Sequence, residues 1–333
     1  MLEIQQKLGK IGFVLTGGFM RGAFQVGALR AFYNHRVIPH YIAGVSAGAI
    51  NGAAFAAGKM DGLHYIYEQI ARYPHRYVYR WNMYALLKVF FWSESLLVNT
   101  PLRRIVTERI NMQDLISSPI KVDIITSDYQ SGRPVIFSNK NPEHQKTEIL
   151  SNAILASAAV PIVFPPYMYK GHQLFDGGVL EQAPLTLAIQ EGCDTIFVIL
   201  NDPPDAVESS NMFKTIYAIG RRSAVLTAWS LTRRHLKRAV EINADVVLYR
   251  KLEKDVLDAV PESAREKVKG VFGRTALSIR TKRYVTIHIL SPDASEENES
   301  KGKFVNYKII PRFLDRGYRD AVALFDRLEH EHQ

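Results

Sequence analysis

The chain has 333 residues, of which 47% are hydrophobic and 23% charged, and its formal net charge is +9. This length allows a substantial core, in one large domain or in one domain with an appendage. The single cysteine, Cys193, excludes an internal disulfide framework and suits a reducing compartment. No run approaches the about 18 apolar residues of a membrane span, and no signal peptide is seen at the N-terminus. We therefore expect a cytoplasmic protein that can contact a membrane peripherally.

Strands and helices alternate along the first part of the chain. Hydrophobic patterning predicts a strand at 11–16, a helix at 22–34, a strand at 40–44, a helix at 46–57 and a mostly helical region to about residue 116, then hairpin strands at 121–128 and 133–138, a helix at 147–159, a hairpin at 167–176, a helix at 184–191 and a strand at 194–200. This alternation predicts an α/β fold with a mainly parallel central sheet flanked by helices. We expect residues 8–205 to form this core. Residues 206–333 are expected to form a mostly helical C-terminal extension, with a late strand and a terminal helix that packs on the core.

A glycine-rich loop follows the first predicted strand and opens a helix. Its sequence is Gly17-Gly18-Phe19-Met20-Arg21-Gly22, and such a loop presents unpaired backbone N–H groups that suit an anion. A dinucleotide-binding loop would need glycine at Phe19 and an acidic residue about 20 residues further on, where His40 to Ile42 stand. We therefore favour an oxyanion hole over a loop that serves packing alone, and both over a nucleotide site.

The second strand runs into Gly44-Val45-Ser46-Ala47-Gly48 and then into an alanine-rich helix pattern. This is typical of a nucleophile elbow, in which a serine on a sharp strand-to-helix turn projects its hydroxyl above the sheet. Small residues at 44, 47 and 48 avoid crowding of the turn. The N-terminus of the following helix directs positive potential toward the serine. The alternative is a Gly/Ala-rich turn whose small residues only permit close packing.

A third stretch, Phe175-Asp176-Gly177-Gly178, ends the hairpin that turns at Lys170-Gly171. An aspartate before two glycines is often only a turn. Here it ends an apolar strand, which is where α/β proteins bring carboxylates to their sites.

The three stretches, in this order, resemble the patatin-like phospholipase family. The resemblance covers most of the chain, from about Lys10 to the stretch Gly317–Ala321, and includes Ala156–Pro166 before the aspartate. It implies a patatin-like fold, related to a three-layer α/β/α sandwich, and a Ser46–Asp176 dyad without histidine. Asp176 would take the proton of Ser46, an acyl-enzyme would form, and backbone N–H groups around Gly17, Gly18 and Phe19 would bind the oxyanion. Neither a metal nor an organic cofactor is implied.

Phe19 departs from the family pattern, which usually has a third glycine there. A phenylalanine adopts a positive φ only at a cost, and its ring could narrow the site. Either the loop has an ordinary conformation, or the oxyanion hole is imperfect.

His288 offers an alternative triad, because the order Ser46, Asp176, His288 matches that of α/β-hydrolases. It lies inside a strand-like run, however, where a histidine is more often structural.

Two segments could contact lipid. Residues 81–98 are rich in aromatic and long apolar side chains and could form a lid or an interfacial helix, or a core-facing helix. Residues 221–238 hold six Lys/Arg and no acidic residue, as in a basic helix on an anionic bilayer or an ordinary solvated helix.

Arg21 either attracts a phosphate headgroup or fixes its loop through a salt bridge. With a charge of +9 and no zinc-finger or RNP-type signature, we expect membrane headgroups rather than nucleic acid as partners.

The sequence as a whole predicts a lipid acyl hydrolase of phospholipase A or lysophospholipase type. The alternatives are a catalytically weak or inactive lipid-binding or regulatory relative, and an esterase of small soluble esters.

Overall fold

A mixed eight-stranded sheet forms the centre of the computed structural model, which describes residues 2–73, 80–81, 94–203, 212, 214–275, 279, 282–293 and 307–330. The strand order is β10-β9-β1-β2-β5-β8-β7, and β6 pairs with β5 outside that path. The strands from β10 to β5 are parallel, whereas β6, β8 and β7 join antiparallel. The bounds are β1 (Ile11–Leu15), β2 (Tyr41–Val45), β5 (Lys121–Asp128), β6 (Arg133–Ser138), β7 (Tyr167–Tyr169), β8 (His172–Asp176), β9 (Thr195–Ile199) and β10 (Thr286–Leu290). The predicted α/β class with a mainly parallel sheet is confirmed.

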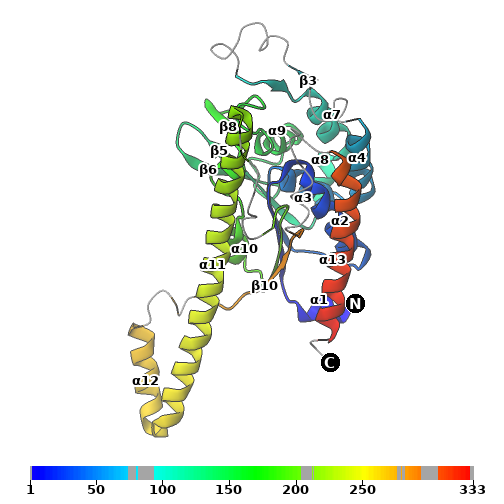
Figure 1. Ribbon diagram of the computed structural model, residues 1–333. Coiled ribbons are helices and arrows are strands. Elements are labelled where there is room, and N and C mark those ends of the chain that lie inside the picture. The colour runs from blue at the N-terminus through cyan, green and yellow to red at the C-terminus, as the bar shows by residue number, and fades with distance from the viewer. Residues whose placement is uncertain are drawn as a thin grey trace.

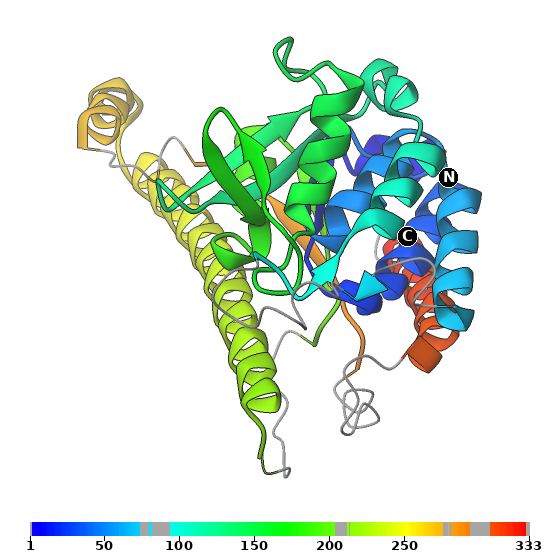
Figure 2. The ribbon, with the colours of Figure 1, turned by 90° about the horizontal axis from the view of Figure 1, so that it is seen from above.

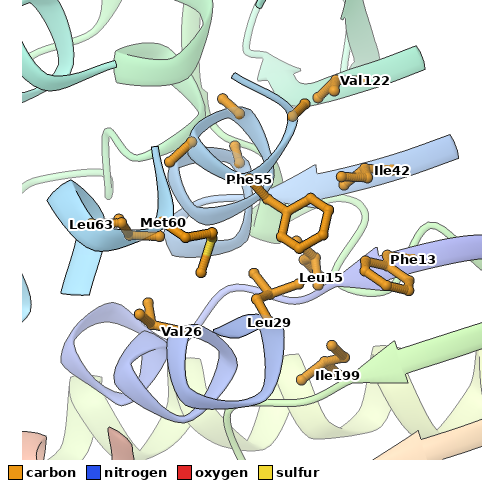
Figure 3. Close-up of a cluster of buried hydrophobic side chains, with 14 of the residues drawn as sticks. Phe13, Leu15, Val26, Leu29, Ile42, Phe55, Met60, Leu63, Val122 and Ile199 are labelled. Atoms are coloured by element: carbon orange, nitrogen blue, oxygen red, sulfur yellow. The ribbon is translucent and has the colours of Figure 1, made fainter. Parts of the chain in front are cut away.

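Helices cover both faces of this sheet, because its strands alternate their buried side chains between two apolar cores. Phe13 and Leu15 of β1 point into the larger core, shown in Figure 3, while Val14 points into the other. The larger core is covered by α2 (Gly22–Asn34), α3 (Ala47–Ala56), α4 (Met60–Arg72), α7 (Thr100–Arg109), α8 (Met112–Ser117), α9 (Thr147–Ser157) and α13 (Ile310–His330). The smaller core is covered by α10 (Leu185–Gln190) and α11 (Ile216–Ala259). The result is a three-layer α/β/α arrangement (Figure 2).

The region predicted to be mostly helical up to residue 116 also contains a small antiparallel sheet, formed by β3 (Arg80–Trp81) and β4 (Leu97–Val98). The prediction of a lid or interfacial helix over 81–98 falls largely on residues 82–93, which lie outside the described residues. The remaining short elements are α1 (Leu2–Lys7) and the 3-10 turns η1 (Phe19–Arg21), η2 (Gly177–Val179) and η4 (Tyr307–Ile309).

The C-terminal part of the chain has two roles in the fold. β10 and α13 pack on the core, whereas the far end of α11 projects from it together with α12 (Glu262–Thr275), as Figure 1 shows. α11 has 44 residues, a length of about 66 Å, and extends past the body to α12 (Figure 1). The chain then returns to place β10 beside β9 and α13 against α2, where the rings of Phe24 and Phe313 meet edge to face at 6.5 Å. The division at residue 206 stays a prediction. Among the described helices, none is long and apolar enough to span a bilayer.

Candidate active site

Two strands that meet end to end along one edge of β5 position the site. The first part of β5 pairs with β2 in parallel, and Thr126–Asp128 pair with β8 in antiparallel fashion, while β6 occupies the other edge. β2 and β8 therefore run in opposite directions. Their C-terminal ends face each other beside the junction of Ile125 and Thr126 in β5. Ser46 follows β2 and Asp176 ends β8. The topology thus brings together two residues that are far apart in the sequence.

Ser46 lies on a sharp turn between β2 and α3, as the elbow pattern predicts. Its backbone is in the left-handed region, with φ 56°, and its side chain is 7% exposed. The following helix passes very close to β1, since a Cβ atom on Gly48 would lie 2.2 Å from the carbonyl oxygen of Leu15. Only glycine fits at this crossing. Close packing therefore fixes the position of the serine above the sheet.

A second serine, which the sequence analysis did not single out, supports this turn. The N–H of Ser46 donates to the Oγ of Ser157 at 2.9 Å, and that hydroxyl donates to the carbonyl of Ile125 at 2.6 Å. Ser157 lies in the 156–166 segment quoted for the family resemblance, but nothing local in that segment reveals its partner.

Asp176 lies beside Ser46. Its carboxylate accepts a hydrogen bond, at 2.8 Å, from the N–H of Gly178, and it is close enough to the Ser46 hydroxyl for that group to lower the pKa of the carboxyl. The residue is 6% exposed, and burial raises the pKa of Asp176 to about 6, although the Ser46 hydroxyl and the N–H of Gly178 both act to lower it. Burial thus gives the carboxylate a pKa suited to accept a proton near neutral pH. Its role as a base stays a prediction.

The glycine-rich loop has an unusual backbone at Phe19. This residue has φ 52°, so the loop keeps the left-handed conformation that a glycine would adopt, not the ordinary one that the sequence left open. Such a conformation costs a non-glycine residue about 1–2 kcal/mol. The loop lies against Asn201, which follows β9, since a Cβ atom on Gly18 would lie only 2.2 Å from the Cβ of Asn201.

Side-chain hydrogen bonds hold the two ends of this loop. At its start, the carbonyl of Thr16 accepts bonds from the side-chain amides of Asn201 (2.8 Å) and Gln25 (2.9 Å). At its end, the side-chain amide of Asn51 donates to the carbonyl of Gly22 at 3.1 Å and to Gln25 at 3.1 Å. All three amide side chains are fully buried. The sequence analysis missed these three residues, because a polar residue in or next to an apolar element was the only local feature that could have indicated their role.

Two further contacts tie the loop to its surroundings. The side-chain amide of Gln182, just past the Asp176 segment, donates to the carbonyl of Gly17 at 3.3 Å. Arg21 forms an ion pair with Asp202 at 2.5 Å. Of the two interpretations of Arg21, the structure therefore supports the salt bridge that fixes the loop.

Two cavities meet at Ser46 and Phe19. One is a cleft of about 510 Å³ that also borders Asp176 and the wall formed by α11, and is lined by Gly17, Gly18, Arg21, Val160, Pro161, Val163, Gly178, Val179, Gln182, Asp202, Ala224, Val225, Thr227 and Ala228. The other is an apolar channel of about 50 Å³ that runs between α3, α4 and α7, and is lined by Met20, Ala47, Ile50, Ala54, Lys59, Leu63, Ile66, Tyr67, Ile70, Leu102, Ile105, Arg109, Ile110, Ala158 and Phe164. An ester bound at Ser46 can therefore direct an apolar chain and a polar part into different spaces.

His288 does not belong to this site. It lies on β10, three strands from β2, or about 14 Å at the usual strand spacing. Its ring stacks on Phe197 with a centroid distance of 5.2 Å. A serine–histidine contact is excluded by this placement. Within the described parts of the chain, no group of three His, Cys, Asp or Glu side chains is arranged to hold a metal ion.

Comparison with known proteins gives the chain its family. The family model described as patatin-like phospholipase matches residues 13–189. An uncharacterised protein of Acanthamoeba polyphaga mimivirus is 25% identical over 251 residues, which are 70% of this chain and 83% of that protein. An uncharacterised NTE family protein of Mycobacterium tuberculosis is 27% identical over 193 residues, 58% of this chain and 49% of that protein. Lysophospholipase NTE1 of Eremothecium gossypii is 26% identical over 193 residues, 57% of this chain and 12% of that protein.

The chain thus spans about half the length of the mycobacterial relative and a small part of the fungal one. Among solved structures, the crystal structure of VipD from Legionella pneumophila matches with a TM-score of 0.39 and 14% identity, covering 96% of this chain and 67% of that one. The family model covers more than half of the present sequence. The chain therefore belongs to the patatin-like phospholipase family, which supports a lipid hydrolase at the level of the family.

Proposed function

We propose that this protein is a serine acyl hydrolase that cleaves carboxylic esters of membrane lipids, of phospholipase A or lysophospholipase type. The observation that carries the proposal is the placement of the buried Asp176 beside the Ser46 hydroxyl, at the point where a cleft meets an apolar channel. The family supports the substrate class, and relatives named lysophospholipase NTE1 support the reaction type.

In the proposed reaction, Asp176 takes the hydroxyl proton of Ser46 as the oxygen attacks the ester carbonyl. The oxyanion is stabilised by backbone N–H groups around Gly17, Gly18 and Phe19, and by the N-terminus of α3. The protonated Asp176 then returns its proton to the leaving alcohol, which departs through the cleft. Water repeats the sequence on the acyl-enzyme and releases a fatty acid and free Ser46.

The apolar channel favours a lipid over the alternative of small soluble esters. Its lining is largely apolar and includes Ile50, Leu63 and Phe164, and burial of each methylene group of an acyl chain there contributes about 0.8 kcal/mol. A short ester would leave this space unused. The alternative of a catalytically weak relative is favoured by one observation, the strained Phe19 in the loop.

Release of fatty acid from mixed phospholipid vesicles tests the proposal, with a fluorophosphonate label read in the same samples. Turnover and labelling should both vanish in Ser46→Ala. They should persist in Ser151→Ala, which removes a serine that is also 7% exposed but lies on α9. Wild-type protein that neither turns over nor labels would favour the lipid-binding relative, and hydrolysis of short soluble esters alone would favour the esterase.

A further inference from the structure

An exposed apolar rim borders the cleft on a wall other than α11. It consists of Leu96, Ile162 and Val179, whose exposed fractions are 48%, 71% and 39%. Val179 lines the cleft itself, and the two neighbours of Ile162 in the sequence, Pro161 and Val163, line it as well. Single exposed apolar side chains are common, but a contiguous apolar patch beside a cleft marks a surface that binds a partner or a membrane.

Ile162 reaches its exposed position through an unfavourable backbone conformation. Its φ is 70°, in the left-handed region that β-branched residues rarely adopt. The turn is closed by the N–H groups of Val163 and Phe164, which both donate to the carbonyl of Val160, at 3.1 and 2.9 Å. Phe164 is thereby directed into the channel while Ile162 faces outward. Neither backbone preference nor core packing accounts for isoleucine at this place, where glycine or asparagine would fit without strain.

Leu96 and Ile162 form one continuous surface. The N–H of Leu96 donates to the carbonyl of Ile162 at 2.9 Å, and the N–H of Leu97 donates to the carbonyl of Val163 at the same distance. The two segments are therefore paired side by side at the edge of the cleft. Leu97 is buried whereas Leu96 is exposed, so the pairing presents Leu96 and Ile162 to solvent together.

The α11 wall of the cleft supplies positive charge. Ala224 and Thr227 line the cleft, and Arg234 and Arg238 follow Thr227 at 7 and 11 positions, which places them on the same face of the helix. Both arginines are exposed, and residues 221–238 contain six Lys/Arg and no acidic residue. Arg238 also forms an ion pair with Glu241 at 3.8 Å, so the face keeps a surplus of positive charge with one partner carboxylate. The cleft therefore opens between an apolar rim and a basic helix. Apolar insertion beside positive charge complements the surface of an anionic phospholipid bilayer.

We propose that the apolar rim inserts into an anionic phospholipid membrane while the basic face of α11 contacts its headgroups, so that a lipid ester passes directly into the cleft. This proposal rests on the proposed function. It assigns Ile162 a role in membrane binding, separate from the chemistry at Ser46.

Partition of the protein onto vesicles tests this role without any turnover. The Ser46→Ala protein is mixed with phosphatidylcholine vesicles, with and without phosphatidylglycerol, at low and high salt, and bound protein is separated by flotation. In this background Ile162→Asn keeps the turn, since asparagine tolerates a left-handed backbone. We expect partition to fall about tenfold, because transfer of a whole isoleucine side chain out of water corresponds to a factor of that order. Thermal unfolding should occur at the same temperature or higher, since strain is removed.

The matched control is Leu248→Gln, which removes a leucine that is 67% exposed but lies about 30 Å further along α11 than the cleft. Its partition should equal that of the parent. The rim proposal would be overturned by full binding of Ile162→Asn, by an equal loss in Leu248→Gln, or by a parent protein that binds no vesicles, in which case the rim suits a partner protein. Failure of the proposed function would appear instead as wild-type protein that binds vesicles and releases no fatty acid.

Discussion

The two strand–turn–helix units beside the candidate site are built alike but held differently. β1 leads through the glycine-rich loop into α2, and β2 leads through the elbow into α3, with a left-handed residue in each turn, Phe19 at φ 52° and Ser46 at φ 56°. Packing holds the elbow, because Gly48 allows α3 to lie against β1. Buried amide side chains hold the loop, because Asn201 and Gln25 bind its first carbonyl. Substitutions in the elbow should therefore act on folding, and those around the loop on rate.

The largest effect is expected from Asp176→Asn, which removes the proposed base beside Ser46. The rate of ester hydrolysis should fall by a factor of about 10² to 10⁴, the usual scale for a general base. Asp123→Asn is the matched control, because Asp123 is also 6% exposed but lies in the first part of β5, where it accepts a hydrogen bond from Tyr41. Near-normal turnover in Asp176→Asn would remove this carboxylate from the mechanism.

Gly48→Ala should break the packing that defines the elbow. The added Cβ would lie 2.2 Å from the carbonyl oxygen of Leu15, and overpacking against backbone of this kind costs about 3 kcal/mol or more. The free energy of unfolding in urea measures the loss. Gly62→Ala provides the contrast, since nothing lies within 4 Å of the added atom on α4; that variant should gain up to about 1 kcal/mol from helix propensity. Equal stabilities of the two variants would refute the packing argument.

Asn201→Ala should show that the loop depends on polar contacts. It removes one of the two side-chain donors to the carbonyl of Thr16, at the start of the loop, and we expect kcat to fall about tenfold, by analogy with partial loss of an oxyanion donor. Asn243→Ala removes two hydrogen bonds, to the N–H and carbonyl of Val285, whereas Asn201→Ala removes one. The loss of stability in Asn243→Ala should be at least as large, but its kcat should be that of the wild type. If both variants lose rate equally, the loop has no special dependence on Asn201.

The buried carboxylate predicts opposite effects of pH on activity and on stability. Because burial raises the pKa of Asp176 to about 6, kcat/KM should fall about tenfold per pH unit below that value as the base becomes protonated. In the same window the folded state binds more protons than the unfolded one, so stability decreases as pH rises from about 4 to about 6. At neutral pH, Asp176→Asn should therefore be more stable than the wild type, by about 2–3 kcal/mol. A pH–rate profile and unfolding at two pH values check both signs, and a flat profile through pH 6 would contradict them.

The smallest effect on rate is expected from Phe19→Gly. Phe19 already has the left-handed φ that glycine would adopt, so the loop backbone should not move, and the rate should change by less than about tenfold, well below the loss of an oxyanion donor. The chain-length preference should shift, because the Phe19 side chain borders both the cleft and the channel. A large gain in rate would show that the ring obstructs the oxyanion hole.

Local sequence predicted the elements of the site but not what holds them together. The elbow at Ser46 and the strand-ending Asp176 were recognisable because glycine spacing and strand boundaries are local properties. The pairing of β8 end to end with β2 along β5 could not be predicted, because register depends on contacts between distant segments. For the same reason Ser157 and Asn201 were missed. The left-handed backbone at Phe19 contradicts its local preference, and the contact of Gly18 with Asn201 is the tertiary constraint that accompanies it.

The meeting of β2 and β8 on one edge of β5 also bears on a chain that is still being synthesised. Ser46 leaves the ribosome long before Asp176, and the two come together only when the 167–176 hairpin docks on β5. Contacts between such distant segments form late in folding. On the proposed mechanism, a nascent or truncated copy carries a serine without its base. On that mechanism, hydrolytic competence depends on the docking of this hairpin, which completes the pair of residues.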